Sequence, residues 1–426
     1  MVKLLIVADD FTGALDTGVQ FKNSRTRVCV GAQCIEEAAL WASEVEVLVI
    51  DTETRHLPPE EAYAIVHDIV RRAVEKRVPY IYKKTDSALR GNIGAELAAV
   101  LDASGAKRVH FVPAFPQMGR VTVEGVHYVD GCPVSQSVFG QDPYEPVTSS
   151  DVAEIVRSQT HHEVHCMAAG APQAEGILIY DCASQEELDS ITRELAARDE
   201  LHVLSGCAGL ASALPAHIRL AREEKQLPAL TDDLLVVCGS INPLTERQIE
   251  VARLHGAVSI SLTAGEKLQP DWIDTPEGMR RIGSWRKRIC AARCAILQSV
   301  GSEDAPTMPG ETPGLAPDEV RTRISHALGR VCRKMMDSGL RRTLLVTGGD
   351  TLRALLSELQ VRSLIPLGEV MCGVVCCRLQ YRGREYALLS KSGGFGEEEL
   401  ILRLQDVIET SRQLVEEHRE NEVKQA

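Results

Sequence analysis

Apolar and polar positions alternate on two different scales along the chain. Short runs rich in Val, Ile and Leu predict strands at residues 3–8, 46–50, 80–83 and 108–112. Longer amphipathic segments lie between them. One of these, residues 58–76, opens with proline and two glutamates, where a helix dipole favours negative charge. This alternation is typical of parallel sheets covered by helices on both faces.

The alternation is interrupted twice and then resumes. Residues 119–146 are less regular and predict a hairpin-like insertion, after which the segments GILIYD and LHVLSG predict further strands. The polar stretch 221–233 contains proline and precedes a new strand, so we place a domain boundary near residue 228.

Strands in the second half are predicted in LLVVCGS, AVSISLT, CAILQSV and TLLVTGG, each followed by helical sequence. Residues 301–319, rich in Gly and Pro, predict a long surface loop. The expected fold is therefore α/β, with two domains, 1–228 and 229–426, that each have a mainly parallel sheet flanked by helices.

The composition narrows the class of partner. A net charge of -13 argues against a surface for nucleic acid or anionic membranes, because proteins that bind such polyanions present a basic excess. No apolar run approaches the roughly 20 residues that a membrane helix needs. The N-terminus also lacks the length and cleavage site of a signal peptide. We expect a cytoplasmic protein with no nucleic-acid or membrane partner.

The 13 cysteines do not predict a metal site. Their number is odd, no C-x-x-C spacing occurs, and most lie in apolar runs, which is typical of reduced thiols in a core. The group His161, His162, His165 and Cys166 has polar surroundings, and we interpret it as solvated surface rather than as a set of metal ligands.

Several predicted strands end abruptly in polar residues or glycines. Ligands bind outside the carboxyl ends of the strands in open α/β sheets, so these junctions are expected to share one functional edge. At the first junction Asp9 and Asp10 end the strand, and Thr12 could cap a helix that begins near Gly13. A lone aspartate there would be an N-cap. Capping needs only one oxygen, so a ligand role for at least one of the two is an equal alternative.

Basic side chains gather at two further junctions. Arg55 follows the second strand, and the loop after the third mixes basic and polar residues: Lys83, Lys84, Asp86, Ser87, Arg90 and Asn92. Each charge alone would be solvated surface. Together they indicate a pocket for a small anion that bears hydroxyls, because a guanidinium forks onto a carboxylate and carboxylates accept hydroxyl protons.

Three glycine-containing turns follow strands in the second half. They contain Gly239, Ser240, Asn242 and Thr245; Gly348, Gly349, Asp350 and Thr351; and Lys391, Gly393, Gly394 and Gly396. Glycine lets the backbone approach a phosphate, and the helix that follows offers free N–H groups. No turn is a P-loop, and each alone could be a capped tight turn. Three of them together predict a nucleotide site in the C-terminal half.

The motifs ADDFTGALD, TETR, KKTDSALRGNIGAE, VPAFPQMGR, CGSINPLTERQ, TGGDT and KSGGFG, in this order, resemble the four-carbon acid sugar kinase family. Its members phosphorylate threonate, erythronate and related acids with ATP. The resemblance covers nearly the whole chain and implies an N-terminal domain for the acid, a C-terminal domain for ATP with Mg²⁺, and an active site in the interdomain cleft. The opening segment is most similar to the branch that acts on D-threonate. The expected product is D-threonate 4-phosphate, with erythronate and 3-oxo-tetronate as alternative substrates.

The resemblance also implies roles for single residues. Substrate contacts are implied for Asp9, Arg55, Lys83, Lys84, Thr85, Asp86 and Arg90, and ATP contacts for Ser240, Gly348, Gly349, Asp350, Thr351, Gly393 and Gly394. Arg55 and Lys83 would hold the carboxylate, while Asp9 would accept hydrogen bonds from the hydroxyls. Asp10 or Asp86 would be the catalytic base. Asp350 would either touch the shell of the metal ion or cap its helix.

Two other functional classes are weighed against this one. A hydroxy-acid dehydrogenase or lyase would bind a dinucleotide at the glycine turns, but no G-x-G-x-x-G follows the first strand. A non-catalytic sensor with two α/β lobes would bind the acid without turning over ATP. A homodimer is common among enzymes of this architecture and is one assembly that fits it.

Overall fold

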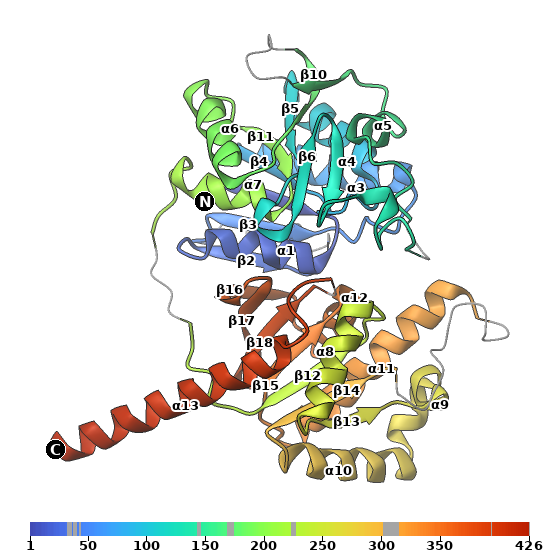
Figure 1. Cartoon of the computed structure of the whole chain (residues 1–426), viewed down its shortest axis with the longest axis vertical. Coiled ribbons are helices and arrows are strands. Elements are labelled where there is room, and N and C mark those ends of the chain that lie inside the picture. Colours follow the sequence, from blue (N-terminus) through green and yellow to red (C-terminus); the bar gives the residue numbers. More distant parts are fainter. Residues whose placement is uncertain are drawn as a thin grey trace. The chain divides into compact units, whose positions relative to one another are not determined.

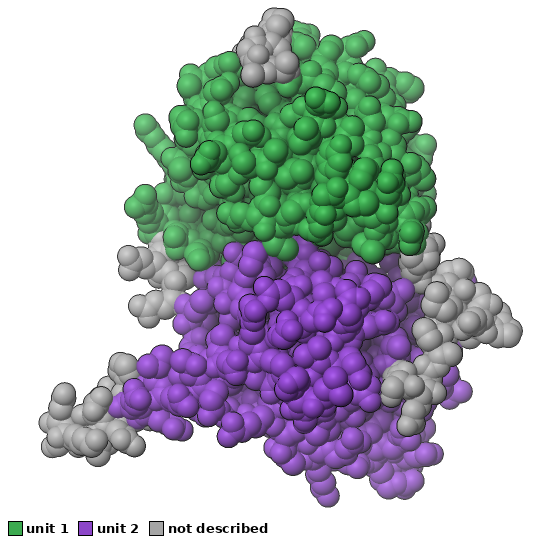
Figure 2. All heavy atoms as spheres, viewed as in Figure 1, with its two compact units in different colours: residues 1–225 green, residues 226–426 purple. Residues whose placement is uncertain are grey.

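The computed structural model describes residues 1–31, 36, 41, 44–142, 146–167, 174–222, 227–300, 315–392 and 394–425. The chain forms two compact units, residues 1–225 (unit 1) and 226–426 (unit 2), which are coloured separately in Figure 2.

Unit 1 is built on a parallel sheet (Figure 1). Its strand order is β2-β3-β1-β4-β11-β5-β10-β9, and every described pair in it is parallel. The strands are β1 (Leu4–Ala8), β2 (Thr26–Cys29), β3 (Val47–Asp51), β4 (Tyr80–Lys84), β5 (Arg108–Val112), β9 (Val164–Met167), β10 (Gly176–Tyr180) and β11 (Val203–Gly206). The inner strands are buried on both faces, which explains their continuous apolar runs.

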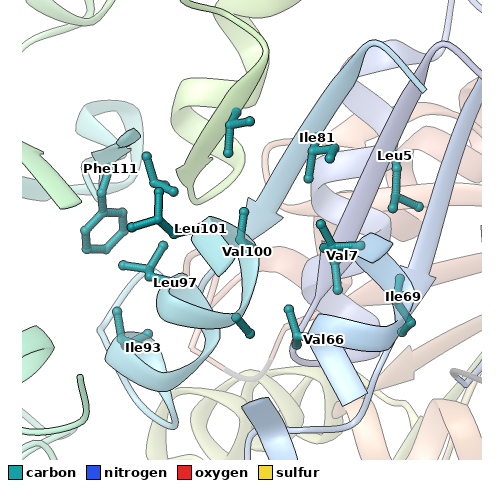
Figure 3. Packing of buried hydrophobic residues seen from close by; sticks show 14 of the residues in the cluster. Leu5, Val7, Val66, Ile69, Ile81, Ile93, Leu97, Val100, Leu101 and Phe111 are labelled. Atoms are coloured by element: carbon teal, nitrogen blue, oxygen red, sulfur yellow. The ribbon is translucent and has the colours of Figure 1, made fainter. Parts of the chain in front are cut away.

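Helices cover both faces of this sheet. They are α1 (Phe11–Gly18), α3 (Pro59–Glu75), α4 (Ile93–Ser104), α5 (Val152–Arg157), α6 (Gln185–Ala197) and α7 (Ala208–Ala213). Figure 3 shows Val66 of α3 and Leu97 of α4 packed with Val7, Ile81 and Phe111 of the sheet. Side chains alternate along a strand, so the odd-numbered residues of β1 and β4 face α3 and α4.

The predicted hairpin-like insertion is a small antiparallel sheet in the order β6-β7-β8. Its strands are β6 (Arg120–Val123), β7 (Val126–Val129) and β8 (Cys132–Pro133). The buried His127 ring donates from Nε2 to the carbonyl of Ser87, at 2.9 Å, so the insertion is fastened to the loop that follows β4.

Unit 2 contains a mixed sheet in the order β13-β14-β12-β15-β18-β17-β16. The strands are β12 (Leu234–Cys238), β13 (Val258–Ser261), β14 (Cys294–Gln298), β15 (Thr343–Thr347), β16 (Ser363–Met371), β17 (Val374–Tyr381) and β18 (Arg384–Lys391). The pairs β13–β14, β14–β12, β12–β15 and β15–β18 are parallel. Strand β17 runs antiparallel to both of its neighbours, β16 and β18.

The helices of unit 2 also lie on two faces of the sheet. They are α8 (Pro243–Leu254), α9 (Ala264–Leu268), α10 (Pro276–Cys290), α11 (Pro317–Asp337), α12 (Gly349–Glu358) and α13 (Leu400–Gln425). Helices α8 and α13 pack on the face that carries Val236, Cys238 and Leu345. Helices α11 and α12 contact each other away from this cluster.

The structure confirms the α/β prediction and most of the predicted strands. The first-half strands begin or end within one residue of the expected positions, and α3 occupies the predicted amphipathic segment. Three features were missed: strand β2; strand β9, which contains His165 and Cys166 of the group interpreted as solvated surface; and the antiparallel strands β16 to β18, where a helix-flanked parallel pattern was expected. Most of the predicted loop 301–319 lies outside the described residues. No helix within the described ranges is long and apolar enough to cross a membrane.

Candidate functional site

The first group of site residues lies where the strand order of unit 1 reverses. The chain leaves β1, forms β2 and β3 on one side, and then crosses to β4 on the other side of β1. The register pairs Ala8 with both Asp51 and Lys84, so the loops after β1, β3 and β4 leave the sheet side by side. Open α/β sheets bind ligands at such a switch point.

Arg55 forms ion pairs with both aspartates of the loop after β1. Its Nε lies 2.7 Å from Asp9 Oδ2, and one terminal nitrogen lies 2.6 Å from Asp10 Oδ1 and 3.5 Å from Asp86 Oδ1. The Arg55 side chain is only 9% exposed. One guanidinium therefore bridges three carboxylates that the sequence places in two separate motifs.

Lys84 enters the same cluster from β4. Its Nζ lies 3.4 Å from Asp9 Oδ1 and 3.5 Å from Asp10 Oδ1. A Cβ at Gly13 would lie 2.1 Å from this amine, so the glycine of the ADDFTG motif makes room for Lys84. The need for glycine at this position is a packing requirement.

The structure identifies the helix cap among the alternatives that the sequence left open. Asp10 is the N-cap of α1, with an extended backbone, and its Oδ1 accepts from Gly13 N at 3.2 Å. The helix begins at Phe11, two residues earlier than expected. Thr12 lies inside it and donates its hydroxyl to Asp10. Asp9 makes no cap contact; its two oxygens face Arg55 and Lys84.

The loop after β4 forms the other side of the cluster. Asp86 accepts from Arg90 Nε at 2.8 Å and from a terminal nitrogen of Arg90 at 3.1 Å, a bidentate pair. The Arg90 guanidinium also lies 3.5 Å from Asp142 and 5.0 Å from the centroid of the Phe139 ring. Arg90 is therefore held partly by the insertion, which the sequence did not predict.

Two of the predicted substrate contacts lie elsewhere. Lys83 points to the opposite sheet face from Lys84, because side chains alternate along β4, and its Nζ lies 3.0 Å from Glu96 Oε2. Both of those side chains are fully buried. The Thr85 hydroxyl is also buried, without a hydrogen-bond partner among the described residues.

The charged groups of this cluster shift one another's pKa values. Burial would raise the pKa of Asp10, but Arg55 and Lys84 outweigh it and hold that pKa well below its usual range. Burial opposes ionisation of Asp86 as well, and Arg90 and Arg55 reverse the effect, so its pKa is also strongly lowered. Burial would lower the pKa of Lys84, yet Asp9 and Asp10 raise it. At neutral pH Asp10, Asp86 and Lys84 are therefore charged, so the cluster presents cations and carboxylates side by side.

Unit 2 has an equivalent switch point. The chain runs from β12 to β13 and β14 on one side and then crosses to β15 on the other. The register pairs Cys238 with Thr347 and Thr347 with Lys391. The three glycine-containing turns thus leave adjacent parallel strands at the same edge of the sheet.

The first two of these turns contact each other. A Cβ at Gly239 would lie 2.1 Å from Thr351 Oγ1, so glycine is required for this contact. Gly348 has φ 97°, a conformation that residues with a side chain rarely adopt, and it precedes α12 directly. Ser240 accepts from Asn242 N at 3.2 Å, and Asn242 caps α8. The starts of α8 and α12 therefore lie at one edge; α8 is capped by Asn242, whereas the N-cap of α12, Gly348, has no side-chain cap, and an uncapped helix start can bind phosphate.

Asp350 does not cap α12, because the N-cap residue is Gly348. Its Oδ2 lies 3.3 Å from a terminal nitrogen of Arg321 on α11. Of the remaining predicted ATP contacts, Gly349 is the first residue of α12 and Gly394 lies in the turn after β18. Gly393 lies outside the described residues.

Lys391, which the sequence marked without assigning it a role, ends β18 and reaches the first turn of α8. It is 1% exposed, and its Nζ donates to Thr245 Oγ1 at 3.4 Å and to the Ser392 carbonyl at 3.0 Å. The Thr347 hydroxyl on the neighbouring strand is buried, with no hydrogen-bond partner in the described ranges. Gln248 of α8 donates to two carbonyls of the turn after β18 and so ties that turn to α8.

Two family models match consecutive parts of the chain. One is a sugar-binding N-terminal domain, over residues 4–214, and the other is a nucleotide-binding C-terminal domain, over residues 235–401. A D-threonate kinase from Salmonella typhimurium is 30% identical over 425 residues, which cover 94% of this chain and 97% of the relative. The chain belongs to the four-carbon acid sugar kinase family.

Other members of this family are similarly related. A D-threonate kinase from Bordetella bronchiseptica is 29% identical, with 96% of this chain and 98% of that protein covered. A D-erythronate kinase from Heliobacterium modesticaldum is 28% identical, with 82% and 84% covered. Solved structures from Salmonella typhimurium LT2 and Haemophilus influenzae share the fold of this family member, with TM-scores of 0.75 and 0.67. They are 18% and 19% identical, cover 95% of this chain, and are themselves covered to 99% and 100%.

One group of buried residues in this chain was not predicted from the sequence. Glu96 and Thr54, which contact each other behind the first cluster, were not singled out. A signal was present, since Glu96 is the charged residue within the buried apolar run IGAELAAVL of α4. A charge on an apolar helix face predicts a buried partner.

Proposed function

We propose that the protein transfers the γ-phosphoryl group of ATP to the terminal hydroxyl of D-threonate and so forms D-threonate 4-phosphate. Family membership and two relatives named as D-threonate kinases support this substrate. The observation that carries the proposal is the cluster of Arg55, Lys84, Asp9 and Asp10 at the switch point of unit 1. It combines cations that suit a carboxylate with anions that suit hydroxyls.

In this proposal Arg55 and Lys84 bind the carboxylate of the acid, and Asp9 accepts hydrogen bonds from its hydroxyls. Arg90 lies beside them through its shared partner Asp86. The carboxylate near the attacking hydroxyl is either Asp10 or Asp86 in this proposal. Their lowered pKa values keep them ionised, so either can orient that hydroxyl, although neither is a strong base. Phosphoryl transfer asks mainly for positioning and charge neutralisation.

We propose that ATP binds the three turns of unit 2, with its phosphates at the first turn of α12. Lys391 would contact these phosphates, and the Thr347 hydroxyl on the neighbouring strand would contact them as well. Mg²⁺ would arrive with the nucleotide and neutralise charge on the β- and γ-phosphates. The described residues contain no group of three or more His, Cys, Asp and Glu side chains that could hold a metal ion.

A coupled ADP-release assay tests the function. Mg-ATP is offered with D- and L-threonate, D- and L-erythronate and 3-oxo-tetronate, and turnover with D-threonate is expected. Turnover with another of these acids alone would reassign the substrate within the family. If folded protein binds D-threonate in calorimetry but releases no ADP, the sensor alternative is favoured. Size-exclusion chromatography with light scattering on the same sample tests the proposed homodimer.

The proposed role of Lys391 predicts a pH profile. Burial lowers the pKa of Lys391 to about 8, against the opposing effect of the neighbouring Cys238. The amine is charged below this pKa, so kcat/KM for ATP should fall as the pH rises through it. In Lys391→Met, kcat/KM for ATP should be about a hundredfold lower at pH 7, and this alkaline limb should be absent.

Lys334→Met is the matched control for this profile. Lys334 lies on α11 of the same unit, and its amine lies 2.7 Å from Asp274 at the surface. This variant should keep both the rate and the alkaline limb of the wild type. An unchanged profile in Lys391→Met would show that Lys391 has no contact with the phosphates.

A further inference from the structure

A group of fully buried polar side chains lies behind Arg55. Thr54, Lys83 and Glu96 are each 0% exposed, and they come from the loop after β3, from β4 and from α4. Burying charged groups is costly unless they are paired and hydrogen-bonded, and an apolar core of the same shape is often equally stable. Stability alone therefore gives no reason for an ion pair at this position.

The contacts form one continuous path. Lys83 Nζ lies 3.0 Å from Glu96 Oε2 and donates to the carbonyl of the next residue at 2.8 Å. The other oxygen of Glu96 accepts the Thr54 hydroxyl. The Thr54 and Thr52 hydroxyl oxygens are 2.7 Å apart, and the Thr52 hydroxyl oxygen lies 2.8 Å from the Ala8 carbonyl oxygen, so the single Thr52 proton can serve either contact. The path therefore ties the loop that carries Arg55 to the ends of β1 and β4.

This loop has a backbone that needs such support. Glu53 has φ 57°, a left-handed conformation that is uncommon outside glycine and persists where the surroundings determine it. Asn92 at the start of α4 donates to the carbonyls of Thr54 and Leu57, both at 2.8 Å. The direction in which Arg55 leaves the loop is thus set by groups that lie under the site.

Gly91 closes the other side of Arg55. It has φ 87°, and a Cβ added there would lie 3.0 Å from Arg55 Cγ and 3.3 Å from Arg55 Cα. The aliphatic part of the Arg55 side chain is therefore packed against Gly91, and its backbone is held from the other side. Few alternative rotamers are open to it, and this kind of pre-organisation lowers the cost of binding an anion.

We propose that Glu96, acting through Thr54, is a positioning residue for Arg55 and hence for the carboxylate of the acid substrate. Burial raises the pKa of Glu96, and Lys83, 3.0 Å away, is the cation that opposes this shift. The inference rests on the proposed function, because the position of Arg55 matters only if Arg55 binds the acid. It adds three residues that act without touching the substrate.

The first test is an isosteric change at Thr54. Thr54→Val removes the hydroxyl and keeps the shape, and it should raise KM for D-threonate about tenfold or more while KM for ATP stays within about twofold. Thr54→Ser keeps the hydroxyl and should behave as the wild type. Calorimetric titration of D-threonate, without ATP, should show the same loss of affinity in Thr54→Val and thus gives a readout that does not depend on turnover.

Thr192→Val is the matched control. Thr192 is also fully buried in unit 1 and donates one hydrogen bond, to Leu188 of its own helix α6. It should lose similar thermal stability without a change in either KM. If Thr54→Val and Thr192→Val have the same KM for D-threonate, the positioning role is overturned. If the wild type fails to turn over any acid of the panel, the proposed function fails instead.

A second variant keeps the test sharp if Thr54→Val folds poorly. The double change Lys83→Met with Glu96→Leu replaces the buried pair with apolar groups of similar size, which often leaves the thermal midpoint unchanged or raised. A stable protein with KM for D-threonate raised about tenfold would support the proposal. A stable protein with an unchanged KM would show that the pair has no part in positioning Arg55.

Discussion

Arg55→Ala should lower kcat/KM for D-threonate at least about a hundredfold, mainly through KM for the acid, and leave KM for ATP nearly unchanged. Arg55 contacts Asp9, Asp10 and Asp86 at once, so its loss removes the proposed carboxylate ligand and the charge that balances three neighbouring anions. Breaking a buried ion pair by removing one partner costs about 3 kcal/mol or more, so the variant should also unfold at a lower temperature.

Two further variants separate binding from stability. Arg55→Lys keeps the positive charge but loses the bidentate fork, so KM for the acid should still rise while the thermal midpoint falls less than in Arg55→Ala. Arg108→Ala is the control. Arg108 is the first residue of β5 and pairs with Glu200 at 2.8 Å, so it lies at the amino ends of the parallel strands, whereas the Arg55 cluster lies at their carboxyl ends. Initial-rate kinetics and thermal unfolding are measured on all three. An unchanged KM for the acid in Arg55→Ala would remove Arg55 from the substrate site.

Gly348→Ala should lower kcat/KM for ATP about a hundredfold and leave binding of D-threonate unchanged. The change does not create a clash, since the nearest atom to a Cβ at this position is Thr351 Oγ1, at 3.6 Å. It forces an alanine to adopt φ 97°, which costs on the order of 1–2 kcal/mol. The turn should relax to another conformation, and the N–H groups at the start of α12 would then no longer face the phosphates.

Gly339→Ala is the matched control for strain. Gly339 has φ 86°, has no atom within 4 Å of an added Cβ, and precedes β15 at the end of the strand away from the turns. Both variants should lose similar stability in thermal unfolding, and only Gly348→Ala should lose nucleotide affinity in a titration with ATP. Equal ATP affinities in the two variants would place the phosphates elsewhere.

The sequence predicted the fold, the charged edge of unit 1 and the glycine-rich edge of unit 2 because those features are local. Buried parallel strands are continuous apolar runs, and the residues that end them, such as Asp9 and Gly348, follow directly in the chain. The start of α1 was placed two residues late because either Asp10 or Thr12 could cap it, and only the backbone conformation shows that Asp10 does.

Contacts between distant parts of the chain could not be predicted in this way. Lys83 and Lys84 are adjacent in one motif, yet strand alternation directs the first to Glu96 and the second to Asp9. Arg90 is held by Asp142, and no pattern in the sequence relates the two. Strands β16 to β18 were missed because their apolar and polar residues alternate around a β-bulge and two turns, which weakens any helix or strand period.

The connection from β17 to β18 offers a place to open the chain. Tyr381 pairs with Arg384, and the two residues between them, Arg382 and Gly383, both have positive φ, as in a type I′ hairpin. Arg384 begins β18 and Lys391 ends it. At about 3.4 Å per residue, the two residues lie roughly 24 Å apart along the strand. The turn is therefore remote from the edge with the three glycine-containing turns, although it belongs to a strand that ends at that edge. A circularly permuted chain with new termini at this hairpin, or a fluorophore attached there, would report on that strand without occupying the turns proposed to bind phosphate.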